Sequence, residues 1–406
     1  MKTSPPVPEC RPLEGITVVD FTSNIAGPSA TLVLADLGAR IIKVEPPGGD
    51  VSRTWTPQAD GIATVFAAFN RGKESIVIDG KHADGRRLMH RMVATADVFI
   101  ESMRPGKAGA LGLGWDELHA INPRLIYCSI NAFGDVGPMA GAAGFDAIIQ
   151  AYSGLMHLTG YPDANPARVG GAVIDVGTGM WGALGILGAL LQRQQDGCGR
   201  QVPVTMLGTA VGFMMHHLTS TRLAGVEPQR LGTAQHNFAP YQAVRTADQM
   251  VMLGINSDAM WLRAATILGN AELGRDPRFA TNAARMKNIA ELVVAIELLT
   301  EMLPADEVVA RLTKANVPTS VVRTLGALAV DPQLDALGMW GTTARGSILP
   351  RTPVADVSRT IGDVPRPGEH TRSILRGLGL SEAETTALET NCVIGAEPRI
   401  AAAALA

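Results

Sequence analysis

The chain has 406 residues, enough for two or three domains, and its 46% apolar and 18% charged residues are typical of a soluble globular protein. A net charge of −3 and an aromatic content of only 4% argue against a nucleic-acid-binding protein, which needs basic patches or aromatic stacking platforms.

The N-terminus, the apolar runs and the cysteines bear on the cellular compartment of the protein. The segment MKTSPPVPECRPLEG lacks the apolar core of a signal peptide, and runs such as Met180–Leu191 fall short of the ~20 residues that span a bilayer. The cysteines at 10, 128, 198 and 392 form no CxxC pair, which argues against a zinc site or a disulfide framework. We therefore expect a cytoplasmic protein with no metal and no membrane contact.

The first 130 residues alternate between strand-like and helix-like patterns. Strands are expected at 16–21, 40–45, 75–78, 98–100 and 125–130, with helices at 29–37 and 83–95. This alternation predicts an α/β fold, a Rossmann-like parallel sheet covered on both faces. The turn after the first strand, TSNIAGP, lacks the GxGxxG fingerprint, which argues against an NAD-dependent oxidoreductase.

The remainder of the chain is expected to form further helices and a second, smaller domain. We expect helices at 147–155, 178–193 and 206–223, the last apolar on most sides and buried between subunits or domains. The pattern restarts with a strand at 250–253 and helices at 258–268 and 289–303. The predicted division is a large Rossmann-like domain at 1–200, a linker helix at 201–225, a smaller α+β domain at 226–325 and a return segment at 326–406.

Asp175 is the candidate catalytic residue. It lies in GGAVIDVGTG, where an aliphatic run leads to a glycine-flanked turn just before the long helix 178–193. Free backbone N–H groups at a helix N-terminus favour an ionised carboxylate, which is a competent nucleophile. An aspartate before a helix is more often only an N-cap, so this segment alone leaves both roles open.

The chain resembles the family III CoA-transferases, the group of formyl-CoA and carnitine CoA-transferases. The resemblance extends from about residue 12 to 385 and rests on nine segments in the same order. They are PLEGITVVDFTSNIAGP, ADLGARIIKVEPPGGD, FNRGKESIVID, DVFIESMRPG, LGLGWDEL, GFDAIIQAYSGLMHLTG, VGGAVIDVGTGMWGALGILGALLQR, RLGTAQHNFAPYQAVRTAD and GEHTRSIL. SGLMHLTG and RLGTAQHNFAPYQAV are most similar to the transferases that use succinyl-CoA and dicarboxylates.

The resemblance implies a reaction and an assembly. Asp175 would attack an acyl-CoA thioester to form a mixed anhydride and then an aspartyl-CoA thioester. CoA enters as a substrate, so no other cofactor is expected. The donor would be succinyl-CoA and the acceptor a dicarboxylic acid. The family's interlocked dimer is expected, as a homodimer or as a hetero-oligomer with a paralogous subunit.

The resemblance also suggests binding residues. Contacts to CoA are expected at Ile25, Ala26, Ile78, Lys81, Ser102, Met103 and Arg104, with Phe145 and Asp146 beside Asp175. Pro46 and Ala110 replace arginines that hold the nucleotide in formyl-CoA transferase, so Arg71 or Lys107 is expected as the substitute cation. His236 and Asn237 are candidates for a substrate carboxylate. Ile25 replaces a glutamine and the glycine-rich covering loop is missing, so formate and oxalate should be poor substrates.

Two other functions remain as alternatives. The 2-methylacyl-CoA racemases are similar but carry a Gly-His-Asp motif, where this chain has Gly144-Phe145-Asp146. A phenylalanine cannot exchange a proton, so a racemase would lack one of its two bases. A non-catalytic CoA-ester-binding subunit is the other alternative, and the intact Asp175 argues against it.

Overall fold

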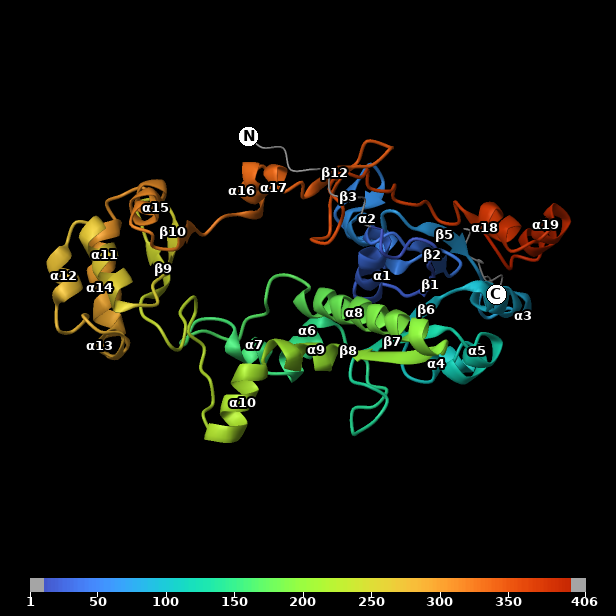
Figure 1. Cartoon of the computed structure of the whole chain (residues 1–406), viewed down its shortest axis with the longest axis horizontal. Helices are drawn as coiled ribbons and strands as arrows, with labels where there is room; N and C mark the ends of the chain where they lie inside the picture. The colour runs from blue at the N-terminus through green and yellow to red at the C-terminus, as the bar shows by residue number, and fades with distance from the viewer. Residues whose placement is uncertain (1–10, 396–406) are drawn as a thin grey trace, which may run out of the picture. The chain divides into compact units, whose positions relative to one another are not determined.

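The computed structural model describes residues 11–395 and divides them into two compact units (Figure 1). The large unit contains the residues up to Ser153, Val169–Thr219 and the residues from Gln333 onward. The small unit contains Gly154–Arg168 and Ser220–Pro332. The small unit therefore includes a loop from the first half of the chain in addition to the 226–325 region.

The large unit is built on a parallel sheet whose six strands lie in the order β5-β2-β1-β6-β7-β8. The strands are β1 (Thr17–Phe21), β2 (Arg40–Glu45), β5 (Glu74–Val77), β6 (Val98–Glu101), β7 (Ile126–Asn131) and β8 (Arg200–Thr205). In this doubly wound order the winding reverses between β1 and β6. The carboxyl ends of β1 and β6 therefore open a crevice, the usual ligand position of such folds.

Strand β8 was missed by the sequence analysis, which interpreted Gly197–Arg200 only as a break. Its Val202 and Val204 alternate with more polar residues, and Pro203 lies between them. Proline is tolerated at the edge of a sheet, where one side of a strand needs no hydrogen bonds, and β8 is an edge strand. The short length and the proline weakened the local pattern.

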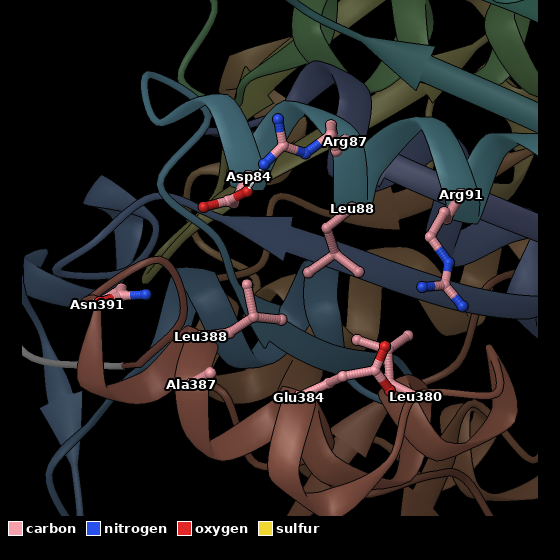
Figure 2. A pocket seen from close by; sticks show the side chains of 9 residues that line it. All are labelled: Asp84, Arg87, Leu88, Arg91, Leu380, Glu384, Ala387, Leu388 and Asn391. Atoms are coloured by element: carbon pink, nitrogen blue, oxygen red, sulfur yellow. Dashed lines mark hydrogen bonds and ion pairs between the residues drawn. The ribbon is translucent and has the colours of Figure 1, made fainter.

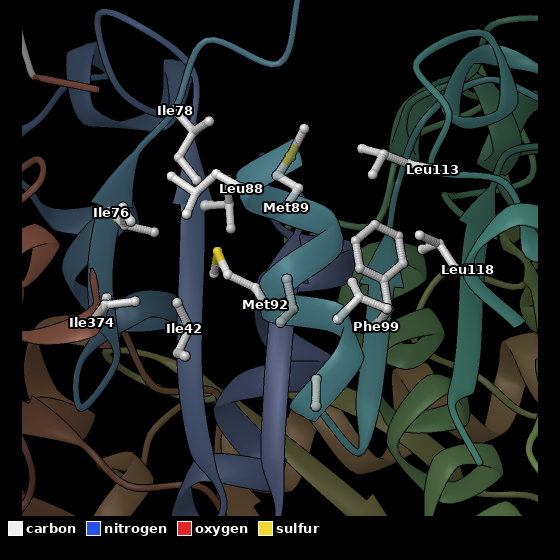
Figure 3. Packing of buried hydrophobic residues seen from close by; sticks show 14 of the residues in the cluster. Ile42, Ile76, Ile78, Leu88, Met89, Met92, Phe99, Leu113, Leu118 and Ile374 are labelled. Carbon is white, nitrogen blue, oxygen red and sulfur yellow. The ribbon is translucent and has the colours of Figure 1, made fainter. Parts of the chain in front are cut away.

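Helices cover both faces of the sheet. On one face α3 (Ala83–Thr95), α5 (Trp115–Ile121) and α18 (Thr371–Gly377) enclose a core (Figure 3). There Met89 and Met92 of α3 lie over the strand residues Ile42, Ile76 and Phe99. On the other face α1 (Ala26–Asp36) and α8 (Val173–Asp196) pack on the sheet and on each other.

Helix α8 is a core helix with close glycine contacts. Its 24 residues are enough, by length and apolar composition, to span a membrane, although half of its most apolar stretch is buried in this fold. A Cβ on Gly179 would collide with Ser29 and with the backbone of α1, so glycine is required for the close approach. The expected start of this helix at residue 178 was five residues too late, because α8 begins at Val173.

The predicted helix 206–223 is two helices, α9 (Met206–Phe213) and α10 (Met215–Ala224), separated at Met214. Within the single chain these helices are not enclosed. Phe213 is 46% exposed and Met215 62%, while Met180 and Leu184 of α8 are 60% and 57% exposed. The large unit therefore presents an apolar surface formed by α8 and α9.

The small unit has an antiparallel sheet in the order β11-β10-β9, with its own apolar core around Trp261. Its strands are β9 (Tyr241–Arg245), β10 (Met250–Gly254) and β11 (Thr319–Val321). Its helices are α7 (Leu155–Leu158), α11 (Asp258–Ile267), α12 (Ala271–Arg275), α13 (Asn282–Lys287), α14 (Ile289–Thr300), α15 (Ala305–Lys314) and α16 (Leu325–Ala329). Strands β9 and β11 were not identified from the sequence.

The chain then returns to the large unit. The smaller elements of this unit are η1 (Val51–Thr54), β3 (Gln58–Ala59), β4 (Ile62–Ala63), α2 (Thr64–Asn70), α4 (Lys107–Ala110), α6 (Asp146–Tyr152), β12 (Trp340–Thr342), β13 (Ile348–Pro350) and α19 (Glu382–Thr390); α17 (Pro332–Ala336) begins at the boundary. The return segment is fixed at Arg71, whose guanidinium binds Asp36 and the carbonyl of Pro350. It is also fixed by a bridge between Ile78 and Ile394.

Candidate active site

The N-terminus of α8 is capped by a residue from another helix. Ala172 occupies the N-cap position and has no side-chain oxygen to accept a hydrogen bond. Instead, Oδ2 of Asp146, the first residue of α6, accepts the backbone N–H groups of Ile174 at 2.8 Å and of Asp175 at 3.2 Å. Asp146 is thus buried for a structural reason, and it joins α6 to the start of α8.

A second residue of α6 organises the loop that enters α8. Gln150 is fully buried, and its Nε2 donates to Asp146 Oδ1 at 2.6 Å. Its Oε1 accepts the backbone N–H of Val169 at 2.9 Å. The sequence analysis did not identify Gln150, although its position one helical turn after Asp146 was a usable signal.

Asp175 lies in the first turn of α8 rather than in a turn before it. Burial and, second, the nearby carboxylate of Asp146 raise the pKa of Asp175 to about 7. The expectation of an ordinary ionised carboxylate was therefore wrong. The N–H groups that were expected to stabilise its charge are bound by Asp146 instead.

The next turn of α8 is tightly packed. Thr178 Oγ1 contacts Thr209 Oγ1 of α9 at 2.9 Å, and a Cβ on Gly177 would collide with Phe213. Phe145, by contrast, is 67% exposed at the start of α6. The backbone beneath Asp175 is therefore rigid, and an apolar ring stands exposed next to Asp146.

The crevice between β1 and β6 lies beside the same helix. Ile25 and Ala26 begin α1, and Gly179, one turn after Asp175, packs against the carbonyl of Ala26. Ser102 Oγ accepts the backbone N–H of Ser23 at 3.1 Å and so links the loops that follow the two strands. The structure therefore brings Ile25, Ala26 and Ser102 to the crevice at the carboxyl ends of the strands.

The loop after β6 rests on a buried acid that the sequence analysis did not identify. Glu101 Oε2 accepts the backbone N–H of Met103 at 2.6 Å. Burial raises the pKa of Glu101 to about 7. Arg104 and Lys107 follow as exposed cations on the same loop, in a position suited to phosphate groups.

Ile78 and Arg71, two of the expected binding residues, are buried, whereas Lys81 is exposed. The side chain of Ile78 is buried in the core, and Lys81 is exposed on the turn after β5. Arg71 is buried, and Nη1 and Nη2 bind Asp36 at 2.7 and 2.8 Å. We expected Arg71 to hold the nucleotide, but its charge is neutralised by Asp36 at the amino-terminal edge of the sheet. Its role here is structural.

His236 and Asn237 belong to the small unit, where both are exposed. Their loop is held by Gln235, whose Oε1 accepts the backbone N–H groups of Asn237 at 2.6 Å and of Phe238 at 3.1 Å. Asn282 Nδ2 donates to the carbonyl of Asn237 at 2.9 Å. The loop thus presents its polar side chains on an ordered backbone.

A buried network of charged residues stabilises the loop that follows β1. Asp20 Oδ2 binds Lys73 Nζ at 3.1 Å, and Lys43 Nζ binds Asp50 Oδ2 at 2.8 Å and the carbonyl of Thr22 at 3.1 Å. The ionisable groups of these four acids and bases are at most 1% exposed. The charged residues within otherwise apolar strands were a signal for this network that the sequence analysis did not use.

The fold and site define an α/β enzyme with a half-buried carboxylate beside a ligand crevice. The model of CoA-transferase family III matches residues 13–371. The chain therefore belongs to this family and is a CoA-transferase with acyl-CoA and carboxylate substrates.

Similar proteins have been characterised in other organisms. The chain is 36% identical to the succinate–glutarate CoA-transferase of Agrobacterium fabrum over 92% of this chain and 98% of the relative. It is 37% identical to the acetyl-CoA:oxalate CoA-transferase of Acetobacter aceti over 87% of this chain and 91% of the relative. A crystal structure of a CaiB/BaiF family protein from Brucella suis has a TM-score of 0.84 and 38% identity, and the match covers 91% of this chain and 100% of that one.

Proposed function

We propose that the enzyme transfers CoA from succinyl-CoA to a dicarboxylic acid through covalent intermediates on Asp175. The observation that carries this proposal is the position of Asp175 in the first turn of α8, half-buried and facing the charge of Asp146. A carboxylate that is poorly solvated and receives no cation is destabilised, and such a carboxylate is a stronger nucleophile when it ionises.

The proposed steps begin with an ionised Asp175. One carboxylate oxygen attacks the thioester carbonyl carbon, the C–S bond breaks and CoA leaves as the thiolate. The product is a mixed anhydride of Asp175 and the donor acid. The thiolate then attacks the aspartyl carbonyl, which releases the donor acid and leaves an aspartyl-CoA thioester.

The second half of the reaction reverses these steps with the acceptor. The acceptor carboxylate attacks the aspartyl thioester and releases CoA thiolate, which then attacks the acceptor carbonyl of the new anhydride. Asp175 leaves as the carboxylate. One thioester is consumed and one is formed, so the exchange needs little driving force, but water must be kept from the anhydride.

The proposed acids rest on similarity and on the residues around the site. The Agrobacterium relative is named for succinate and glutarate, both dicarboxylates. Ile25 and Phe145 are apolar, which suits the carbon chain between two carboxylates. His236 and Asn237 are proposed to hydrogen-bond the distal carboxylate.

The test is a panel of acids incubated with succinyl-CoA and the enzyme, with CoA esters followed by mass spectrometry. We expect glutarate and other dicarboxylic acids of four or more carbons to form CoA esters fastest. The panel must include oxalate, because the Acetobacter aceti relative is named as an oxalate CoA-transferase. Faster transfer to oxalate, formate or a simple monocarboxylate would reject the dicarboxylate proposal and leave the transferase activity intact.

We also propose that the enzyme is an interlocked homodimer. The exposed apolar side chains of α8 and α9, among them Trp181 at 44% and Leu184 at 57%, support a partner subunit on this surface. Light scattering and mass photometry should show one species at twice 42.6 kDa with no monomer at nanomolar concentration. A monomer that increases on dilution would contradict interlocking, and a requirement for a second polypeptide would indicate a hetero-oligomer.

A further inference from the structure

A polar cavity lies at the amino-terminal edge of the large sheet, the edge opposite the crevice. Its volume is about 270 Å³, and it is bounded by Gly38 and Ala39 directly before β2 and by the return segment at 351–362. Its charged lining consists of four arginines and two aspartates, Arg11, Arg71, Arg351, Arg359, Asp36 and Asp356. Within the described residues Arg71 pairs with Asp36 and Arg11 pairs with Glu14 at 2.7 Å, which leaves Arg351 and Arg359 against the one carboxylate of Asp356.

The two aspartates are already occupied. Asp36 binds Arg71 with both oxygens, and its Oδ2 also accepts the N–H of Thr352 at 3.2 Å and the hydroxyl at 2.8 Å. Asp356 Oδ1 accepts the N–H and the hydroxyl of Ser358 at 2.9 and 2.6 Å. Asp36 therefore neutralises Arg71 and has little capacity for the other arginines.

The other three arginines keep unused donors, although Arg11 Nη1 binds Glu14 at 2.7 Å and Arg351 Nη1 donates to the carbonyl of Asp356 at 3.3 Å. The Nε atoms of Arg11 and Arg351 are shielded from solvent and have no hydrogen-bond acceptor among residues 11–395. Arg359 is half-buried, and its guanidinium has no hydrogen bond or ion pair within the same residues. A shielded N–H without an acceptor is costly, so these groups favour a bound acceptor, and their charge favours an anion.

A second cavity also contains arginines, but these arginines bind acceptors of the protein. It is about 380 Å³ and lies between α3 and α19, where Leu88 and Leu388 face each other (Figure 2). Of its arginines, Arg87 binds Asp84 and Arg91 donates to the carbonyl of Leu378 at 2.9 Å. Here the donors are used, and the lining has no comparable excess of charge.

We propose that the cavity of Arg11, Arg351 and Arg359 binds a small oxyanion with two negative charges, a phosphate or a dicarboxylate. A planar guanidinium presents parallel donors that match both groups. Arg351 and Arg359 come from the return segment and Arg11 from the start of the chain. The bound anion therefore links the return segment to the α1–β2 edge of the sheet, independently of the reaction at Asp175.

The experiment is hydrogen exchange by mass spectrometry on the whole protein with inorganic phosphate, succinate or chloride at equal ionic strength. Phosphate or succinate should slow exchange of the amides at 351–362 several-fold relative to chloride. If only phosphate protects these amides, the ligand is a phosphate, and if only succinate does, the ligand is a dicarboxylate. If both protect them, the cavity recognises the oxyanion chemistry that the two ligands share.

Two variants and a control complete the test. Arg359→Gln and Arg351→Gln should each weaken the anion effect about tenfold, because each removes a charge-assisted donor. Arg87→Gln, in the second cavity, should leave it unchanged. Arg359→Gln is the safer variant, since the side chain of Arg359 has no hydrogen bond or ion pair to lose among residues 11–395. Equal exchange in chloride, phosphate and succinate, or wild-type binding by both cavity variants, would overturn the proposal.

Discussion

Two aspartates of the large unit are removed from water, and the protein treats them in opposite ways. Asp20 is fully buried, and burial would raise its pKa, but the charges of Lys73 and Lys43 and the hydrogen bonds from two threonines hold the pKa well below its usual range. Asp175 is less buried, and no cation among residues 11–395 compensates for its burial. Its pKa rises to about 7 because of burial and the charge of Asp146.

The two aspartates differ in role: Asp20 stabilises the fold, whereas Asp175 is proposed to react with the substrate. Asp20 is ionised at all working pH values and fixes the first turn through Thr22, Thr31 and Lys73. Asp175 has lost solvation of its charge without gaining a cation from residues 11–395, which supports its proposed role as the nucleophile. Burial alone does not identify a catalytic acid; the sign of the neighbouring charges does.

The largest expected effect is on catalysis at Asp175. Asp175→Asn removes the nucleophile and should lower the rate of CoA transfer by roughly 10³-fold or more, because no covalent intermediate can form. Asp175→Ala should do the same, measured by CoA-ester formation. Asp163→Asn, an exposed aspartate, serves as the control and should retain wild-type activity. Retention of substantial transfer by the Ala variant would exclude the covalent mechanism.

Asp20→Asn should instead destabilise the fold. It leaves Lys73 buried beside a neutral partner, and breaking a buried ion pair typically costs about 3–5 kcal/mol of unfolding free energy. Urea unfolding at pH 7 measures this loss, with Asp163→Asn expected within about 0.5 kcal/mol of wild type. A loss below about 1 kcal/mol for Asp20→Asn would show that the network contributes little to stability.

The pH dependence of transfer should report the ionisation of Asp175. The carboxylate is the nucleophile, so kcat/KM should be full above its pKa of about 7 and fall about tenfold per pH unit as the pH drops below it. Initial rates from pH 5.5 to 9 at limiting succinyl-CoA measure this profile. An enzyme that keeps full kcat/KM down to pH 5 would show that Asp175 is ionised there in the free enzyme.

The same pKa predicts a change in stability that is smaller and opposite in sign to that of Asp20→Asn. The folded pKa of Asp175 is raised above its unfolded value, so the ionised group destabilises the folded state fully above about pH 7. Asp175→Asn should therefore stabilise the protein by about 1–3 kcal/mol at pH 8, with the gain shrinking as the pH falls toward 4. Thermal unfolding at pH 8 and pH 5 measures both values, and a loss of stability at pH 8 would contradict the raised pKa.

The smallest effect is expected at His236. If His236 binds the distal carboxylate, His236→Ala should raise KM for the dicarboxylate a few-fold with little change in kcat, because the ground and transition states share this contact. His157→Ala, another exposed histidine of the small unit, is the control. An unchanged KM would remove His236 from the proposed site.

The sequence by itself determined the parallel α/β architecture and the family, and it gave the position of the acid proposed to react. Five strands and the helices between them carry strong local periodicity, so their types follow from neighbouring residues. Asp175 was singled out by the resemblance to the CoA-transferase family, because its own segment left the role of an N-cap open. Helix boundaries were less accurate: α8 begins at Val173, five residues before the expected start.

Only the tertiary structure determined the pKa of Asp175 and the hydrogen bonds around it. Asp146 lies 29 residues before Asp175 and reaches the start of α8 through the packing of α6, so no local pattern reveals that it binds the helix N–H groups. Arg71 likewise meets Asp36 and Pro350 only after the return segment folds back. A pKa depends on which charges the fold brings within a few ångströms, and that distance is set by contacts far apart in the sequence.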